Sequence, residues 1–184
     1  GASTFESFVA QDKPTIDALN EAGLDVSAVG NHEFDQGYDD LVNRVIAEYD
    51  ADTNPDGGAE WKYLGANVKF KASGDPALDG TWIKDQGGVQ VGYVGAVTEH
   101  LPELVSPAGI ADIEVTDIVE ATNAAADDLV AEGADIVVLL VHEGSPTTDC
   151  DEIAALGAGT DFGSIVQGVN DNVDAIVSGH THLE

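Results

Sequence analysis

Three histidine-containing clusters each follow a short apolar segment of the chain. Residues 30–35 read Gly-Asn-His-Glu-Phe-Asp, residues 141–144 read Val-His-Glu-Gly, and residues 178–182 read Ser-Gly-His-Thr-His. A short apolar run bounded by polar residues is typical of a buried strand. Because ligand sites in α/β folds lie beyond the carboxyl ends of the strands, we expect the three clusters to form one polar site.

The clusters contain the side chains of a metal site. His180 and His182 flank a single threonine, so their imidazoles could ligate one metal or two neighbouring metals, and His142 and Asn31 add further ligands. Imidazole nitrogen combined with oxygen donors suits Zn, Mn, Fe or Co better than Ca. One histidine at a strand end is usually a hydrogen-bonded structural residue, but four histidines in three such clusters favour a metal site.

The histidine and aspartate of the first cluster form a candidate catalytic pair. Asp35 follows His32 by three residues and can accept its ring N–H, which fixes the tautomer and favours the protonated ring. An imidazolium beside a metal-bound anion can stabilise developing charge or protonate a leaving oxygen. Asp35 could also, or instead, cap a helix beginning near Tyr38. His100 has no polar cluster around it, and we expect a histidine at the surface or one that contacts a ligand residue, rather than a metal ligand.

The elements that must position these residues alternate between strand and helix. The patterns predict helices at 15–22, 38–49, 117–132 and 162–169, and strands at 26–29, 63–68, 81–85, 89–97, 136–141 and 173–177. Asp12 is a possible N-cap, and the strands at 81–85 and 89–97 read as a hairpin. The aliphatic run 136–141 suggests a strand buried on both faces. This alternation indicates a layered α/β domain.

Composition excludes several classes of function. The chain has 184 residues, which fits one domain, and its six basic and 35 acidic residues give a net charge of −29. Such a surface repels nucleic-acid phosphates and anionic membranes, and there is no apolar run of membrane-spanning length. An anionic substrate would therefore need cations in the site to reverse the local field. The single cysteine, Cys150, lies between two aspartates, which disfavours a reactive thiolate.

The clusters together resemble the motifs of one enzyme family. Residues 30–35 are similar to the Gly-Asn-His-Glu/Asp motif of the calcineurin-like metallophosphoesterases, and the extension to Phe-Asp is similar to the 5′-nucleotidase branch. Residues 141–144 and 178–182 resemble the two later motifs, in the same order. Residues 63–68 and 88–95 resemble scaffold segments of that branch. The resemblance spans nearly the whole chain and implies a layered β-sandwich flanked by helices.

The resemblance also implies roles for the candidate residues. Asn31, His142 and His180 would ligate one divalent transition metal and His182 a second, with His32 and Asp35 as the catalytic pair. The implied reaction is in-line attack on phosphorus by a metal-activated water, with the cations about 3.5–4 Å apart. The implied substrate is a nucleoside monophosphate, and 2′,3′-cyclic nucleotides, nucleotide sugars or a sulfur ester remain alternatives. The family implies a secreted, periplasmic or cell-wall location.

The sequence departs from the family pattern at its start. The family has an Asp-x-His motif and then a Gly-Asp motif whose aspartate bridges the metals, and neither stands upstream of Gly30. We therefore expect residues 1–182 to be a partial catalytic domain, with residues 183–184 as a tag remnant and the C-terminal nucleotide-binding domain absent. We expect at most partial metal occupancy and little activity from the chain alone. A natural non-catalytic metal-binding or scaffold module is the alternative. The missing strands should expose a sheet edge that invites oligomerisation or pairing with another chain.

Overall fold

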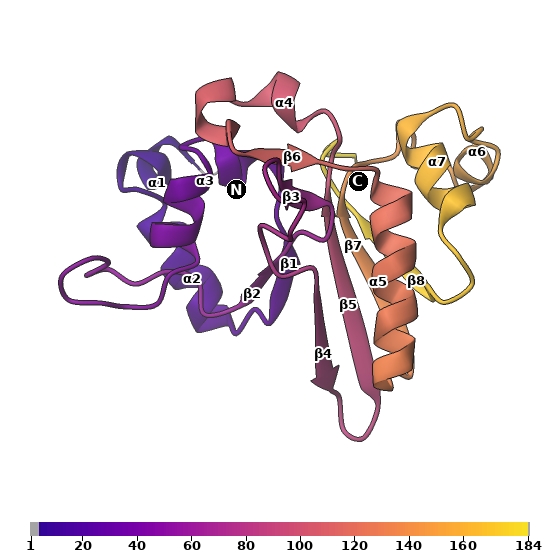
Figure 1. The fold of residues 1–184 in the computed structure, drawn as a ribbon, viewed down its shortest axis with the longest axis horizontal. Helices are drawn as coiled ribbons and strands as arrows, with labels where there is room; N and C mark the ends of the chain where they lie inside the picture. The colour runs from indigo at the N-terminus through magenta and orange to yellow at the C-terminus, as the bar shows by residue number, and fades with distance from the viewer. Residues whose placement is uncertain (1–3, 184) are drawn as a thin grey trace.

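A computed structural model describes residues 4–183 as a mixed α/β fold, which confirms the expected fold class (Figure 1). The α-helices are α1 (Phe5–Val9), α2 (Lys13–Ala22), α3 (Tyr38–Asp40), α4 (Leu101–Leu104), α5 (Ile118–Glu132), α6 (Cys150–Ala154) and α7 (Asp161–Gly168). The strands are β1 (Val26–Ala28), β2 (Lys62–Leu64), β3 (Val68–Phe70), β4 (Thr81–Asp85), β5 (Gln90–Val97), β6 (Ile113–Val115), β7 (Ile136–His142) and β8 (Ala175–Ser178). Two 3-10 helices, η1 (Asn31–Phe34) and η3 (Pro107–Ile110), and a π-helical segment, η2 (Leu41–Val45), complete them.

The largest sheet has the order β4-β5-β7-β8. The pair β4–β5 is the expected antiparallel hairpin, whereas β5, β7 and β8 run parallel. Strand β1 pairs in parallel with β2, and β3 pairs antiparallel with β6. In the parallel register Val97 lies beside His142, and Val141 lies beside Ser178. The carboxyl ends of β5, β7 and β8 are therefore level with one another.

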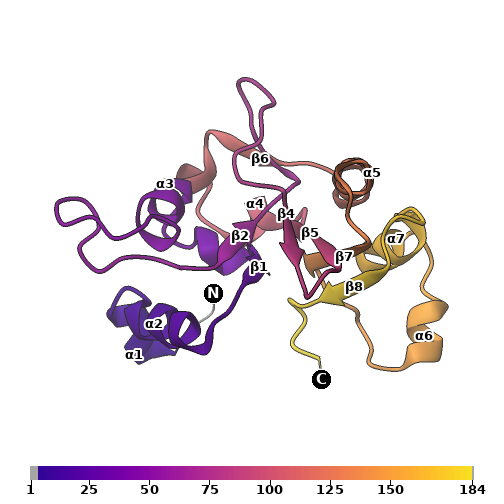
Figure 2. The same cartoon turned by 90° about the horizontal axis from the view of Figure 1, so that it is seen from below.

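Helices cover the strands on two sides. Figures 1 and 2 show α1, α2 and α3 on one side of the molecule and α5, α6 and α7 on the other, with the strands between. One buried cluster includes Phe34, Leu41 and Leu101, and a second, under α5, includes Leu129 and Leu139. Within residues 4–183, no helix is long and apolar enough to cross a membrane.

Helix α5 forms almost where the pattern predicts a helix, at 117–132, and both of its ends are capped. The Asp117 side chain accepts a hydrogen bond from the Glu120 N–H at 2.7 Å, which satisfies a donor of the first turn. Gly133 ends the helix with a φ of 101°, a conformation that suits glycine. This long helix packs against β5 and β7 and fixes the sheet from which His142 projects.

Two predicted elements are wrong in their extent. The helix expected at 38–49 becomes π-helical at Leu41 and ends at Val45, whose carbonyl accepts the Ala59 N–H of the following loop at 2.7 Å. The strand expected at 63–68 divides into β2 and β3. Between them the Gly65 N–H donates a hydrogen bond to the Asp79 carbonyl at 2.8 Å, and the Ala66 N–H donates one to the Gly95 carbonyl at 2.7 Å. In both places a contact made far along the chain displaces the local hydrogen bond.

The prediction that residues 136–141 are buried on both faces is also wrong for one face. Val137, Leu139 and Val141 are buried, whereas Val138 and Leu140 are only half-buried. The alternation follows from the period of two residues in a strand. On its less covered face, β7 borders an open groove together with β1 and β8.

Candidate metal site and catalytic pair

Three of the expected ligands meet at the carboxyl ends of their strands. Asn31 begins η1 directly beyond β1, His142 is the last residue of β7, and His180 follows β8. His142 Nε2 lies 2.8 Å from Asn31 Oδ1 and 3.1 Å from His180 Nδ1. The ring centroids of the two histidines are 4.8 Å apart. The sequence rule that strand-end clusters converge therefore holds for these three residues.

The two separations from His142 Nε2 suit a divalent cation. With metal–nitrogen distances of about 2.0–2.1 Å, two ligand atoms of a tetrahedral site lie about 3.3 Å apart, so separations of 2.8 Å and 3.1 Å need little adjustment. Burial lowers the pKa of His142, and the neighbouring His180 lowers it further, which favours the neutral ring that binds metals. Among residues 4–183, no three His, Cys, Asp or Glu side chains come together as a site, so a metal held here would need the amide oxygen of Asn31 as a further ligand.

Two glycines allow the histidine segments to approach. A Cβ on Gly30 would lie 2.7 Å from the His142 ring, and a Cβ on Gly144 would lie 2.2 Å from the Gly179 carbonyl oxygen. Any side chain at these positions would push the three strand ends apart. Close packing rather than backbone freedom thus explains Gly30 and Gly144, whereas a Cβ on Gly179 would meet only the His142 ring, at 4.0 Å.

His182 is placed differently from the other expected ligands. It lines a cavity of about 270 Å³ with Thr147 and Ile153, and His180 reaches the same cavity. Both histidines have left-handed backbones, with φ of 76° at His180 and 56° at His182, which is uncommon for residues other than glycine. Such strain is frequent at functional sites. The role of His182 at a second metal remains a prediction.

The expected contact of the candidate catalytic pair is present. His32 Nδ1 lies 2.9 Å from Asp35 Oδ2, and both side chains are partly exposed. His32 is close enough to His142 to help lower the pKa of that residue. Asp35 does not cap the following helix, since Gly37 holds the N-cap position of α3. Of its two suggested uses, only the contact with His32 is found.

Two carboxylates to which the sequence reasoning gave no role hold the site in place. Glu143 is 7% exposed and accepts the Thr98 hydroxyl at 2.6 Å and the Gly144 N–H at 3.0 Å. Glu33 accepts the Gly30 N–H at 2.6 Å. The spacing of Glu33 three residues after Gly30, typical of a capping box, was a usable signal. The burial of Glu143 depends on distant packing and had no local signal.

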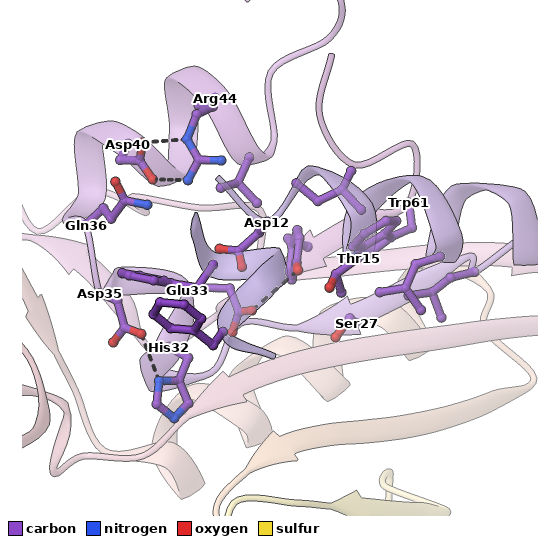
Figure 3. A pocket seen from close by; sticks show the side chains of 17 residues that line it. Asp12, Thr15, Ser27, His32, Glu33, Asp35, Gln36, Asp40, Arg44 and Trp61 are labelled. Atoms are coloured by element: carbon purple, nitrogen blue, oxygen red, sulfur yellow. Dashed lines mark hydrogen bonds and ion pairs between the residues drawn. The ribbon is translucent and has the colours of Figure 1, made fainter. Parts of the chain in front are cut away.

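A pocket of about 570 Å³ opens beside the catalytic pair (Figure 3). His32 and Asp35 lie at one end, and the ion pair of Arg44 with Asp40 lies in another part of the wall. Much of the remaining lining is apolar and comes from α1, α2 and the segments around β1 and β2. It includes Phe5, Phe8, Ile16, Leu19, Leu24, Trp61 and Tyr63.

His100 lies at the surface, as expected. Its Nε2 is 3.3 Å from Asp161 Oδ2, and this contact raises the pKa of His100. The side chain is half exposed. No contact joins His100 to Asn31, His142 or His180 among the described residues.

Comparison with known proteins identifies the family. The model of the calcineurin-like phosphoesterase family matches residues 5–184. Endonuclease YhcR of Bacillus subtilis is 33% identical over 184 residues, which cover 99% of this chain and 14% of that protein. Cell wall protein Lmo0130 of Listeria monocytogenes is 29% identical over 196 residues, covering 99% of this chain and 25% of that protein. A 5′-nucleotidase of Vibrio cholerae is 27% identical over 140 residues, which cover 76% of this chain and 23% of that protein.

A solved structure agrees with these relatives. The calcineurin-like phosphoesterase YfkN of Bacillus subtilis aligns with a TM-score of 0.70 at 29% identity, covering 92% of this chain and 48% of that chain. The chain spans a quarter or less of the length of the three curated relatives. The family match, the motif order and the convergent histidines agree, and the chain belongs to the calcineurin-like phosphoesterase family.

Proposed function

We propose that this chain carries the metal-binding and catalytic residues of a phosphoester hydrolase whose substrate is a nucleotide. The observation that carries the proposal is the convergence of Asn31, His142 and His180, with His32 and Asp35 beside them. Calcineurin-like phosphoesterases generally bind two divalent metals, and the Vibrio cholerae relative is a 5′-nucleotidase.

The proposed ligands suit an anionic substrate. A divalent cation held by Asn31, His142 and His180 would polarise a phosphoryl oxygen and activate a water molecule. Because an amide and two neutral imidazoles add no negative charge, the cation's charge would remain available to the substrate. This matters in a chain of net charge −29, whose surface otherwise repels phosphate. We assign His182 to a second cation.

His32 is the residue that we assign to the reacting phosphoryl group. Its Nδ1 is engaged by Asp35 at 2.9 Å, which leaves Nε2 to donate a proton or hydrogen bond to a phosphoryl or leaving-group oxygen. Asp35 orients the ring through this contact. Both side chains are accessible, at 38% and 41% exposure, so a substrate can reach them.

A nucleoside monophosphate is the substrate that we favour, and a 2′,3′-cyclic nucleotide, a nucleotide sugar or a sulfur ester is the alternative. The relatives also include an endonuclease, but the charge of −29 disfavours a polyanionic nucleic acid. The Listeria relative is named a cell wall protein, which supports a location outside the cytoplasm.

A paired measurement of turnover and metal content tests the proposal. In the full-length product of the gene, His32→Gln should reduce the turnover of AMP by about 100-fold or more while leaving metal content nearly unchanged. His100→Gln is the matched control and should alter neither quantity. Loss of metal from the His32 variant, or full activity in it, would show that the assigned role is wrong.

The 184-residue chain alone should bind a divalent metal weakly and turn over AMP slowly or not at all. The reason is that only one amide and two imidazoles converge within the described residues, without a carboxylate. Rapid metal-dependent turnover by this chain would contradict that expectation. Metal binding without turnover in the full-length product as well would favour a non-catalytic metal-binding module.

A further inference from the structure

The candidate catalytic pair has little support of its own. The side chains of His32 and Asp35 are 38% and 41% exposed and bond to each other. They stand on and just beyond η1, a 3-10 helix of four residues, which is too short to be stable without tertiary contacts. Catalytic groups must nevertheless be held within about 0.5 Å of their working geometry. Neighbouring elements must therefore hold η1 in place.

Two contacts hold η1 from the side of α4 and η3. Within η1, Phe34 is fully buried and belongs to one apolar cluster with Leu101 and Ile110. Beyond η1, Gly37 lies against Gly109, since a Cβ on Gly109 would be only 2.8 Å from the Gly37 Cα. The Gly37 N–H donates to the Phe34 carbonyl at 2.9 Å, which closes the turn that carries the second member of the pair. The place of Gly37 therefore sets the place of that turn.

The end of η3 is fixed by a lysine from another part of the chain. Lys71 directly follows β3, and its Nζ donates to the Ala111 carbonyl at 2.8 Å and to the Ile110 carbonyl at 3.4 Å. Its main-chain N–H donates to the Asp112 carbonyl at 2.9 Å. Lys71 thus holds three consecutive carbonyls at the end of η3, and with them the glycine that meets Gly37.

The same segment is tied at its other end to the strand that carries His142. Thr98 is fully buried, its N–H donates to the His142 carbonyl at 3.1 Å, and its hydroxyl donates to Glu143 at 2.6 Å. Figure 1 shows α4 and the chain after it at the end of the molecule to which β5 and β7 lead, beside α3. Residues 98–110 therefore join a candidate metal ligand to the loop of the catalytic pair.

We propose that residues 98–110 are a positioning element that holds the catalytic pair in place relative to the metal ligands. Gly109 sets the place of the pair, and Thr98 sets that of His142. Both act through other residues, so neither needs to touch a substrate. The inference rests on the proposed function, because it assigns the element to that reaction.

Gly109→Ala tests the first end of the element. The new Cβ meets main chain rather than a flexible side chain, so Gly37 would have to move by about 0.7 Å to restore an ordinary separation of about 3.5 Å. In the full-length product of the gene, kcat for AMP should fall about ten-fold, while KM and Zn²⁺ affinity stay within about two-fold of wild type. Gly157→Ala is the matched control, because a Cβ there would come no closer than 4.0 Å to its nearest neighbour. An unchanged kcat in Gly109→Ala would overturn the role of Gly109.

The tautomer of His32 gives a second measurement that needs neither metal nor substrate. The carboxylate of Asp35 accepts from Nδ1 and therefore selects the Nδ1–H tautomer of the neutral ring. In ¹H–¹⁵N NMR spectra of the 184-residue chain, the Nε2–H tautomer should gain population in Gly109→Ala but not in Gly157→Ala. Lys71→Met, which removes the charge that holds η3 without adding bulk, should act in the same direction, with Lys62→Met as its control. Wild-type spectra in Gly109→Ala and Lys71→Met would overturn the proposal.

Thr98→Val tests the second end of the element. It removes the hydroxyl that Glu143 accepts and should weaken Zn²⁺ binding about ten-fold in isothermal titration, whereas Thr98→Ser keeps the hydroxyl and should bind as wild type does. Thr122→Val is the matched control, since Thr122 is equally buried and its hydroxyl has no hydrogen-bond partner in the described structure. Equal Zn²⁺ affinity in Thr98→Val and Thr122→Val would overturn the role of Thr98. Full turnover in His32→Gln would instead overturn the proposed function, and the tautomer measurement would still test the positioning role by itself.

Discussion

The substitution Gly30→Ala should damage the metal site through a contact that the structure defines. The added Cβ would lie 2.7 Å from Cε1 and Nδ1 of His142, whereas non-bonded carbon atoms are ordinarily separated by about 3.5 Å or more. The His142 ring would have to move by about 0.8 Å, more than the roughly 0.5 Å that a preorganised site tolerates. Gly30 has a φ of −108°, which alanine adopts without strain, so the effect is steric.

We expect Gly30→Ala to reduce Zn²⁺ affinity by about 10–100-fold and to lower the free energy of unfolding by about 1–3 kcal/mol. Isothermal titration with Zn²⁺ measures the first quantity, and urea denaturation of the metal-free protein measures the second. Gly159→Ala is the control, because a Cβ there meets nothing within 4 Å. Equal affinity and stability in the two variants would refute the view that Gly30 is needed for His142 to approach.

Three further substitutions test other parts of the structure. Glu143→Ala leaves two buried donors without their acceptor and should cost about 1–3 kcal/mol of unfolding free energy in urea denaturation; no loss would mean that water replaces the carboxylate. His100→Gln tests a raised pKa. The stabilising contact with Asp161 is fully present below about pH 6.5 and is lost as pH rises through the folded-state pKa of His100. The wild-type protein should therefore melt at a higher temperature than His100→Gln at pH 5 but not at pH 9. High salt should reduce this small difference in melting temperature. Asn67→Ala removes a fully buried amide bonded to the backbone of Val97 and should cost about 2–4 kcal/mol in urea denaturation, against little for exposed Asn43→Ala.

The parts of the fold with strong local signals were predictable from the sequence. Helix α5 forms almost over the expected residues, 117–132, between a capping aspartate and a glycine. The β4–β5 hairpin also forms where the pattern placed it. The division of residues 63–68 was not predictable, because it depends on hydrogen bonds from Gly65 and Ala66 to strands far along the chain. Local pattern cannot report such partners.

The candidate site was predictable to a similar degree. The rule that ligand sites lie at carboxyl strand ends brought Asn31, His142 and His180 together correctly. It could not place His182, because the direction of that side chain depends on left-handed backbone conformations at His180 and His182. It also gave no sign that Glu143 is buried beside the candidate ligands, since that burial arises from packing against Thr98 on another part of the chain.

Anomalous diffraction from a crystal of the protein soaked in Zn²⁺ tests the central claim most directly. The account predicts a peak about 2.0–2.2 Å from Asn31 Oδ1, His142 Nε2 and His180 Nδ1, the three atoms that converge in the structure. A peak bound by other residues, or no peak at these three atoms at a Zn²⁺ concentration that saturates binding in solution, would contradict it.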